Sequence, residues 1–298
     1  MRIAIAGASG FVGRAVAREL QRSGHTIVRI GRANAKRPPD VVWDPARGEL
    51  PSGGIAECEV VVNLAGATIA HRWTSGRKRE ILASRLESTG LLATTMASSP
   101  VRPRLFVSAS AVGYYGDTGD KRVDEYSPKG VGFLADVVAQ WEAAAVPARD
   151  AGIAVVHPRL GLVINASGGA VARLLLPFKL GAGGRIGTGR QWFSWVALTD
   201  AVRAIRFLIE GPTLTGAVNV VSPAAVRNVE FTAALARVLG RPARVHVPES
   251  AVRAVFGQMG EEMLLAGQQA IPRRLTAAGF KFELPDIADA FRVELANG

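Results

Sequence analysis

The sequence predicts an α/β protein whose core is a doubly wound parallel sheet and which carries a small C-terminal α+β substrate cap. Three observations predict this fold. An apolar run at residues 3–7 is followed by regularly spaced glycines and then by a helical pattern. Further apolar, β-branched runs alternate with helical stretches, which is typical of a parallel sheet covered on both faces. From about residue 222 this alternation gives way to short helices broken by prolines.

The first domain, predicted at residues 1–221, consists of these alternating elements. Asp200 stands just before a helical pattern and is expected to be the N-cap of that helix. The basic, proline-containing stretch 33–40 is expected to be a surface loop. The predicted strands are 2–6, 26–30, 41–43, 60–64, 104–108, 154–157 and 217–221, and the predicted helices are 11–22, 77–97, 133–149, 170–180 and 200–210.

The second domain, predicted at residues 222–298, is the cap. It has strand-like segments at 244–247 and 280–282 between its short helices, and the loop around 165–198 is expected to contribute to it. In doubly wound proteins the ligand binds outside the carboxyl ends of the strands. The substrate is therefore expected between these strand ends and the cap.

Composition narrows the classes of protein. The chain has 298 residues and one cysteine, Cys58, which excludes an internal disulfide and is interpreted as a small core residue. It has no apolar run of membrane length and no cleavage-site pattern, so a cytoplasmic protein without a membrane partner is expected. The net charge is +11, but the basic residues are scattered, so we expect phosphate-bearing small molecules rather than nucleic acid. No spacing among the four histidines predicts a metal site.

The glycines after the first predicted strand are the most informative functional signal. They are spaced GxxGxxG between a predicted strand and a predicted helix. The first suits a tight turn, the second lets a pyrophosphate approach the backbone, and the third lets helix and strand pack, as in a Rossmann dinucleotide site. The helix start would offer backbone N–H groups and a positive dipole to the diphosphate. The alternative is an ordinary glycine-rich turn. The residues assigned to this site are Gly7, Ser9, Gly10, Phe11, Val12 and Gly13.

The nucleotide that the sequence predicts is NADP rather than NAD. NAD enzymes usually place an acidic residue about 20 residues beyond the glycines, where it binds the ribose 2′-hydroxyl. This chain instead has Gly31, which leaves room, and Arg32, whose guanidinium suits a 2′-phosphate. The alternative is an ordinary surface arginine. At the end of the fourth strand, the segment Leu64, Ala65 and Gly66 would let the backbone contact the ribose and phosphates of the cofactor.

A set of segments spread over the whole chain resembles one protein family. The segments are GASGFVG (7–13), NLAG (63–66), RW (72–73), SRLESTGLL (84–92), SASAVGYYGD (108–117), RLGLVI (159–164), LLPFKLGAGGRIGTGRQWFSW (175–195), VSPAAVRNVEF (221–231) and AGQQAIPRRLTAAGFKFELP (266–285). They resemble the extended short-chain dehydrogenase/reductases, which are NAD(P)-binding proteins of the sugar-nucleotide epimerase/dehydratase superfamily. More narrowly, they resemble an atypical "epimerase family" subgroup that has a C-terminal domain of unknown function. Its bacterial members are often labelled NAD-dependent epimerases or cell-division inhibitors of the SulA type.

The resemblance implies that NADP contacts the glycine turn and the ends of the second and fourth strands. It adds Glu80 and Arg85, on the helix after Trp73, and Val163, after the sixth strand. Glu80 and Arg85 are five residues apart and do not share one helical stripe. Charges on the helix surface are therefore the alternative interpretation of this pair.

The chain departs from the superfamily at the position that should transfer a proton. Active members use a tyrosine, whose ordinary pKa of about 10 is lowered by a lysine one helical turn away. Counted back from Glu142, the two positions fall at about Leu134 and Val138. Neither of these side chains can transfer a proton.

Three hydroxyl side chains remain as catalytic candidates. Ser110 lies where the superfamily keeps a hydroxyl that binds the substrate, and Tyr114 and Tyr115 follow it on a loop expected to face the nicotinamide. Either tyrosine could be a repositioned acid; the alternative is that both pack over the cofactor. Arg159 and Arg190 are candidates for binding a substrate phosphate or carboxylate, and Arg159 could equally pair with a structural acid.

These observations predict an NADP-binding oxidoreductase or epimerase that acts on a small anionic or sugar-nucleotide substrate without the usual Tyr/Lys pair. The rival prediction is a non-catalytic NADP-binding regulator or sensor, which the cell-division label implies. The missing pair favours the regulator, whereas the cofactor site, the glycine-rich loop 181–195 and Ser110 favour the enzyme. The expected partner is a small molecule, and a homodimer is left open.

Overall fold

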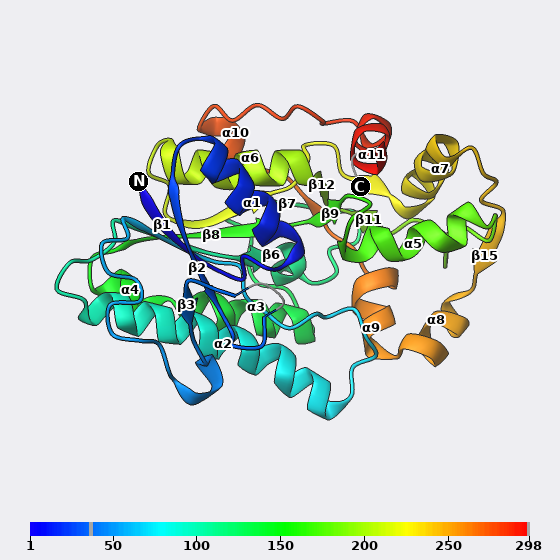
Figure 1. Cartoon of the computed structure of the whole chain (residues 1–298). Helices are drawn as coiled ribbons and strands as arrows, with labels where there is room; N and C mark the ends of the chain where they lie inside the picture. Colours follow the sequence, from blue (N-terminus) through cyan, green and yellow to red (C-terminus); the bar gives the residue numbers. More distant parts are fainter. Residues whose placement is uncertain (36–37, 297–298) are drawn as a thin grey trace.

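The core of the protein is a parallel β-sheet of eight strands (Figure 1). The computed structural model describes residues 1–35 and 38–296, so residues 36–37 of the predicted surface loop lie outside the described residues. The strand order is β13-β8-β5-β4-β1-β2-β3, and β6 pairs with β8. The strands are β1 (Arg2–Ala6), β2 (Thr26–Gly31), β3 (Val41–Val42), β4 (Val60–Asn63), β5 (Leu105–Ser108), β6 (Ser110–Ala111), β8 (Ala154–Leu160) and β13 (Gly216–Val220).

This sheet confirms the predicted Rossmann fold class. The strand order reverses at β1, which pairs in parallel with both β2 and β4, as expected of a doubly wound sheet. Val60, Val61 and Val62 of β4 are all 0% exposed, because both faces of the sheet are covered, and this explains their continuous apolar run. Each of the seven predicted strands begins within one residue of an observed strand.

Helices cover the two faces of the sheet, with α1 and α6 on one side and α2, α3 and α4 on the other (Figure 1). Leu20 and Ile205 belong to the apolar core under the first pair. Leu92 and Met96 belong to the core on the opposite face, which also contains Cys58, as predicted for that residue. Within the described ranges, none of the helices combines the length and apolar character that a membrane crossing requires. The helices are α1 (Phe11–Arg22), α2 (Ser75–Ser98), α3 (Phe133–Ala143), α4 (Val146–Asp150) and α6 (Leu198–Glu210).

The predicted helix 133–149 is wrong as a single element, because the chain forms α3 and α4 there instead. Pro147 lies in the first turn of α4. Proline has no N–H to donate to the preceding turn, and its ring clashes with the carbonyl four residues earlier. It is accepted at a helix start, so the helical path is interrupted just before this residue.

The prediction that Asp200 is the N-cap of α6 is also wrong. The N-cap is Ala197, and Asp200 lies inside the first turn. Asp200 is 0% exposed, and its carboxylate accepts the backbone N–H groups of Glu283 and Leu284, both at 2.9 Å. Arg203 pairs with the same carboxylate at 2.8 Å. Asp200 therefore fastens a distant C-terminal segment to α6, which a local sequence pattern cannot predict.

A second apolar core lies at the carboxyl end of the sheet, between α5, α7 and α11. Trp195, Phe231 and Phe291 are its largest members, and all three are nearly inaccessible. Short ladders surround it: β12 with β9, β11 with β14, and β10 with β15. These elements are β9 (Leu162–Ile164), α5 (Gly169–Lys179), β10 (Gly184–Ile186), β11 (Trp192–Phe193), β12 (Trp195–Ala197), β14 (Val226–Arg227), α7 (Asn228–Leu239), β15 (Val245–Val247), α8 (Glu249–Phe256), α9 (Gln258–Gly260), a π-helical turn (Glu261–Leu265) and α11 (Ile287–Ala296).

Part of the predicted cap returns to the large sheet. β16 (Gln269–Ala270) pairs with β7 (Arg122–Val123), and α10 (Arg273–Ala277) lies beside β13. The predicted strand 280–282 is wrong, because this stretch is irregular. Phe280 instead packs into the core of the sheet, with its ring 5.5 Å from that of Phe207. The domain boundary at residue 222 stays a prediction, and the return of 269–282 shows that the two parts are intertwined.

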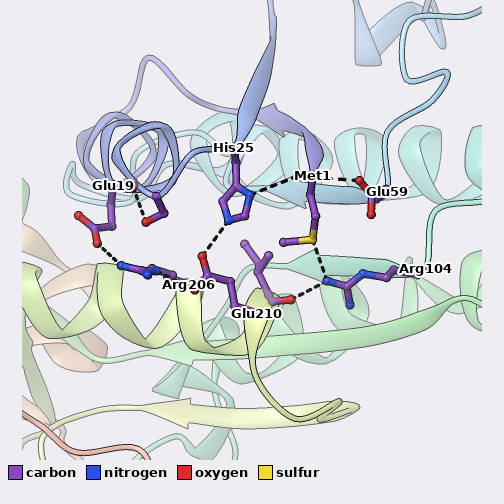
Figure 2. A network of polar contacts seen from close by, with 9 residues as sticks. Met1, Glu19, His25, Glu59, Arg104, Arg206 and Glu210 are labelled. Carbon is purple, nitrogen blue, oxygen red and sulfur yellow. Dashed lines mark hydrogen bonds and ion pairs between the residues drawn. The ribbon is translucent and has the colours of Figure 1, made fainter.

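The start of the chain is tied to α6 by a polar network (Figure 2). His25 Nε2 lies 2.7 Å from a carboxylate oxygen of Glu210, and Arg206 joins that carboxylate to Glu19 at 2.8 and 2.9 Å. Arg104 donates to the carbonyl of Ile209 at 2.7 Å. The network anchors α1 and α6 to each other, far from the carboxyl ends of the strands.

Candidate functional site

A cavity of about 850 Å³ lies where the carboxyl ends of the strands meet the second core. From the sheet side it is lined by Gly10, Leu64 and Ser110, which follow or begin strands β1, β4 and β6. From the other side it is lined by residues such as Trp192 and Phe231. This is the position at which doubly wound proteins bind their ligands.

The glycine turn after β1 has the close contacts that the sequence predicted. Gly7 has a φ of 80°, and a Cβ there would lie 2.6 Å from the backbone of Leu64. A Cβ on Gly13 would lie 2.1 Å from the carbonyl oxygen of Gly7, so only glycine lets α1 approach the strand. Gly10 and Phe11 line the cavity at the start of α1. Val12 and Gly13 also line the cavity, whereas Gly7 and Ser9 are not among the described residues that line it.

The start of α5 reaches the same part of the cavity. Gly168 lines it next to Phe11, and a Cβ on Gly168 would lie 2.5 Å from that ring. The N-cap residues of α1 and α5 are Gly10 and Gly168, neither of which has a side chain to satisfy the first N–H groups. Two helix starts therefore present N–H groups and positive dipoles to one cavity. Val163 of β9 lines it beside them.

Helix α2, beside the loop after β4, brings a half-buried cation to this cavity. Arg85 of α2 donates to the carbonyls of Ile81 and Ala67 at 2.9 and 3.2 Å, and its guanidinium lies 5.0 Å from the ring centre of Trp141. Burial lowers the pKa of Arg85 to about 10. No carboxylate among the described residues forms an ion pair with it. Leu64 and Gly66 line the cavity next to this arginine, whereas Ala65 is not one of the described lining residues.

Three predicted cofactor residues, Glu80, Gly31 and Arg32, are not among the described residues that line the main cavity. Glu80 is exposed on α2 and pairs with Arg77 at 2.5 Å, as the helix-surface alternative expects. Arg32 lines a separate hollow of about 650 Å³ beyond the end of β2, together with Asn34 and Trp43. Gly31 ends β2 just before it. The contacts of these residues with NADP stay predictions.

The two positions to which the sequence assigned the Tyr/Lys pair of the superfamily line the cavity. Leu134 and Val138 of α3 are among the described lining residues, close to Ser110 of β6. Their equivalence to the Tyr/Lys pair, counted from Glu142, stays a prediction. Their apolar side chains leave Ser110, which is 2% exposed, as the hydroxyl on this wall.

Ser110 belongs to a buried polar network. Its hydroxyl donates to Oε1 of Glu142 at 2.5 Å, and Arg159 binds both oxygens of the same carboxylate at 2.8 Å. Arg159 also donates to the hydroxyl of Tyr115 at 3.0 Å, and this hydroxyl donates to Asn219 at 2.7 Å. Burial raises the pKa of Glu142, but the hydrogen bonds and charge of Arg159 outweigh it, so the pKa lies below its ordinary value. Glu142 is therefore an ionised acceptor that holds the proton of Ser110 toward itself.

The two candidate tyrosines pack on this network. Tyr115 is 2% exposed, and burial raises its pKa to about 12. The ring centre of Tyr114 lies 3.5 Å from the guanidinium of Arg159. Neither tyrosine is among the described residues that line the cavity. Their catalytic roles stay predictions.

The predicted substrate arginines are also placed elsewhere. Arg159 is 3% exposed and is neutralised by Glu142, which is the structural-acid alternative that the sequence left open. Arg190 is exposed on the loop before β11, where its carbonyl accepts a hydrogen bond from Arg227 at 2.6 Å. Neither arginine is among the described lining residues.

Sequence reasoning missed one carboxylate at the cavity. Glu262, in the π-helical turn, accepts the N–H groups of Phe133 and Leu134 at 3.0 and 2.9 Å. It thereby caps α3 from the far end of the chain and lines the cavity. One residue in the sequence could have indicated this contact. Gly132 precedes α3, and a helix that begins after a glycine lacks a local side-chain cap. Such a helix needs a partner from elsewhere in the fold.

Two families of known sequences match the chain. The "NAD dependent epimerase/dehydratase family" matches residues 3–221. A "domain of unknown function (DUF1731)" matches residues 247–293. Both parts of the resemblance stated from the sequence are therefore confirmed.

Individual proteins match over nearly the whole chain. The epimerase family protein MT2273 of Mycobacterium tuberculosis is 42% identical over 289 residues, which is 97% of this chain and 95% of the relative. The crystal structure of the human epimerase family protein SDR39U1 (isoform 2) with NADPH is 36% identical in sequence, with a TM-score of 0.91 and 100% of both chains covered. MoeE5, in a complex with UDP-glucuronic acid and NAD, is 19% identical with a TM-score of 0.81, covering 100% of this chain and 98% of that one. This last likeness shows the fold alone.

Proposed function

The chain belongs to the NAD dependent epimerase/dehydratase family, and from this premise we propose that it is an NADP-dependent oxidoreductase or epimerase whose cofactor occupies the cavity at the strand ends. One observation carries the proposal. The cavity joins two helix starts that lack side-chain caps to a half-buried arginine, Arg85, for which the described residues provide no carboxylate. A dinucleotide diphosphate has the charge that these groups require. The human relative crystallised with NADPH supports the choice of NADP.

Each part of the cofactor has candidate residues. The diphosphate would lie over the turn Gly10–Val12, with Arg85 and the backbone after Leu64 beside it. Arg32, at the end of β2, would take the 2′-phosphate. When bound, the nicotinamide supplies or accepts a hydride. The further predicted contacts are Gly7, Ser9, Phe11, Gly13, Gly31, Ala65, Gly66, Glu80 and Val163.

Ser110 is the side chain that we assign to the oxygen of the substrate. Because Glu142 accepts the proton of Ser110, the serine presents oxygen lone pairs to the cavity. It would therefore accept a hydrogen bond from a substrate hydroxyl and hold that group against the nicotinamide. Leu134 and Val138 exclude water from the same wall without taking part in proton transfer. The substrate that the sequence predicts for such a site is a small anionic molecule or a sugar nucleotide.

One observation favours the regulator as a second candidate function. The positions that the resemblance assigns to the Tyr/Lys pair, Leu134 and Val138, give the cavity an apolar wall. A protein that only sensed NADP would need no proton donor. The two candidates make the same prediction for cofactor binding and opposite predictions for turnover.

Turnover separates the candidates. We expect the purified protein to transfer hydride between NADP(H) and an alcohol or carbonyl compound, and Ser110→Ala to lower kcat by about 100-fold, which is within the usual range for acid–base and orienting groups. Tyr114→Phe and Tyr115→Phe are the matched controls and should keep most of the activity. If Ser110→Ala kept full activity and one of the tyrosine variants lost activity, that tyrosine would be the catalytic residue instead of Ser110. NADPH binding without any turnover would support the regulator.

Cofactor preference tests Arg32 independently of the chemistry. NADPH should bind more tightly than NADH, and Arg32→Ala should weaken NADPH binding by about 10- to 100-fold, because it removes a charge-assisted contact worth roughly 1.5–3 kcal/mol. NADH binding should stay unchanged. Arg18→Ala, an exposed arginine on α1, is the charge-matched control. Equal affinity for the two cofactors in the wild type would exclude this role of Arg32.

A further inference from the structure

The part of the cavity nearest the second core is apolar. Its walls come from α5, α7, the short strands β10 and β11, and the π-helical turn. A ligand that extends from Ser110 away from the glycine turn would meet these walls. The residues that form them are Phe178, Ile186, Trp192, Phe231, Met263 and Leu264.

Two of the polar side chains in this part of the cavity, Ser194 and Asn228, already have partners. Ser194 donates to the carbonyl of Gln268 at 2.7 Å and accepts the N–H of Ala270 at 2.9 Å. The side-chain oxygen of Asn228 accepts the N–H of Ile186 at 2.9 Å. These side chains hold the walls together. A ligand could form hydrogen bonds with the Ser194 hydroxyl or the Asn228 oxygen only in competition with these existing bonds.

The charged side chains of the lining are also unsuited to an anion at this end. Among the described lining residues they are Arg85, Arg173 and Glu262. Arg85 lies at the cofactor end, beside Gly66. Arg173 is exposed and donates to the carbonyl of Ala70. Glu262 carries a negative charge, which would repel an anionic ligand.

The chemistry of these walls selects a substrate class. The diphosphate of a sugar nucleotide carries two negative charges, and burying them without cations costs several kcal/mol. An apolar body gains free energy from the same surface. Resting on the proposed function, we propose that the substrate of this site is an uncharged alcohol or ketone with an apolar body, rather than a nucleoside diphosphate sugar. The hydroxyl of the alcohol donates to the Ser110 oxygen, whereas a ketone would be bound only when the Ser110 O–H turns from Glu142 to the ketone oxygen. In both cases the carbon skeleton lies against Trp192 and Met263.

A graded series of probes tests this proposal on the full-length protein. Cyclopentanol, cyclohexanol and cycloheptanol would be supplied with NADP⁺, and the matching ketones with NADPH, while the absorbance of NADPH is followed. Each alcohol that reacts gives up a hydride to NADP⁺ and a proton to solvent, and becomes the ketone. We expect KM to fall by about fourfold for each added methylene, because each buries more apolar surface. UDP-glucose and UDP-glucuronic acid should neither react nor compete.

Two substitutions at neighbouring positions test where the apolar body of the substrate binds. Met263→Ser should raise KM for the largest ring by about tenfold, whereas Leu265→Ser, outside the described lining, should not change it. NADPH affinity, titrated separately, should be unchanged in both variants. Competition by UDP-glucose against the NADPH-loaded protein, or a KM independent of ring size, would overturn the proposal while leaving the proposed function intact. Failure to bind NADPH would instead overturn the proposed function.

Discussion

Replacing Gly10 by valine is expected to abolish NADPH binding while leaving the chain folded. The backbone of Gly10 has φ −71° and ψ 172°, which valine adopts readily, so the substitution creates no backbone strain. A Cβ there would lie 3.2 Å from the carbonyl oxygen of Gly7, and the branched atoms beyond it would enter the space assigned to the diphosphate. We expect the Kd for NADPH to rise at least about 100-fold, equivalent to roughly 2.8 kcal/mol.

Two other glycines serve as controls for this result. Gly90→Ala, on α2, meets nothing within 4 Å and should preserve NADPH binding with equal or higher stability. Gly13→Ala should damage the fold itself, because its Cβ would lie 2.1 Å from the carbonyl oxygen of Gly7. Binding and thermal unfolding should be measured on all three variants. A folded Gly10→Val protein that binds NADPH like the wild type would contradict the proposed position of the diphosphate.

Removing the carboxylate of Glu142 is expected to cause the largest loss of stability. Glu142→Ala would leave the guanidinium of Arg159 buried without its counter-ion and Ser110 without its acceptor. Breaking one side of a buried ion pair costs about 3–5 kcal/mol. Urea unfolding at neutral pH should show a decrease of this size in the free energy of unfolding.

The difference in the free energy of unfolding between the wild type and Glu142→Ala depends on pH through the pKa of Glu142. Its pKa is lowered in the folded state, so the stabilisation is fully present above the ordinary glutamate pKa of about 4.3 and is lost as the pH falls through the lower folded value. The wild type and Glu142→Ala should therefore converge in acid. The double variant Glu142→Leu with Arg159→Met should recover most of the stability, because apolar pairs often replace buried ion pairs at no cost. A double variant as unstable as Glu142→Ala would refute this account of the pair.

Local signals predicted the parts of the site that are local in the sequence. The glycine turn and α1 are contiguous in the chain, so spacing alone placed Gly10 and Gly13. Leu134 and Val138 were predicted to lie on one helix, four residues apart and so on one face, and α3 contains both.

The remaining parts depend on contacts between distant segments. Arg159 belongs to β8 and Glu142 to α3, and no local pattern shows that one neutralises the other. Glu262 and Asp200 satisfy backbone N–H groups that are far away in the sequence. From the sequence alone, Arg159 at the end of β8 was therefore a candidate for binding an anionic substrate. The structure shows that Glu142 pairs with it instead.

The most direct test of the account is energy transfer from tryptophan to NADPH. Trp141 and Trp192 both line the cavity, so NADPH bound there should quench tryptophan emission and raise its own, whereas NADPH bound elsewhere on the chain would do so less. We expect saturable transfer at one NADPH per chain, which NADH reproduces only at higher concentration and which Gly10→Val lacks. Titration to millimolar NADPH without saturable transfer in the folded wild type would contradict the central claim that this cavity holds NADP.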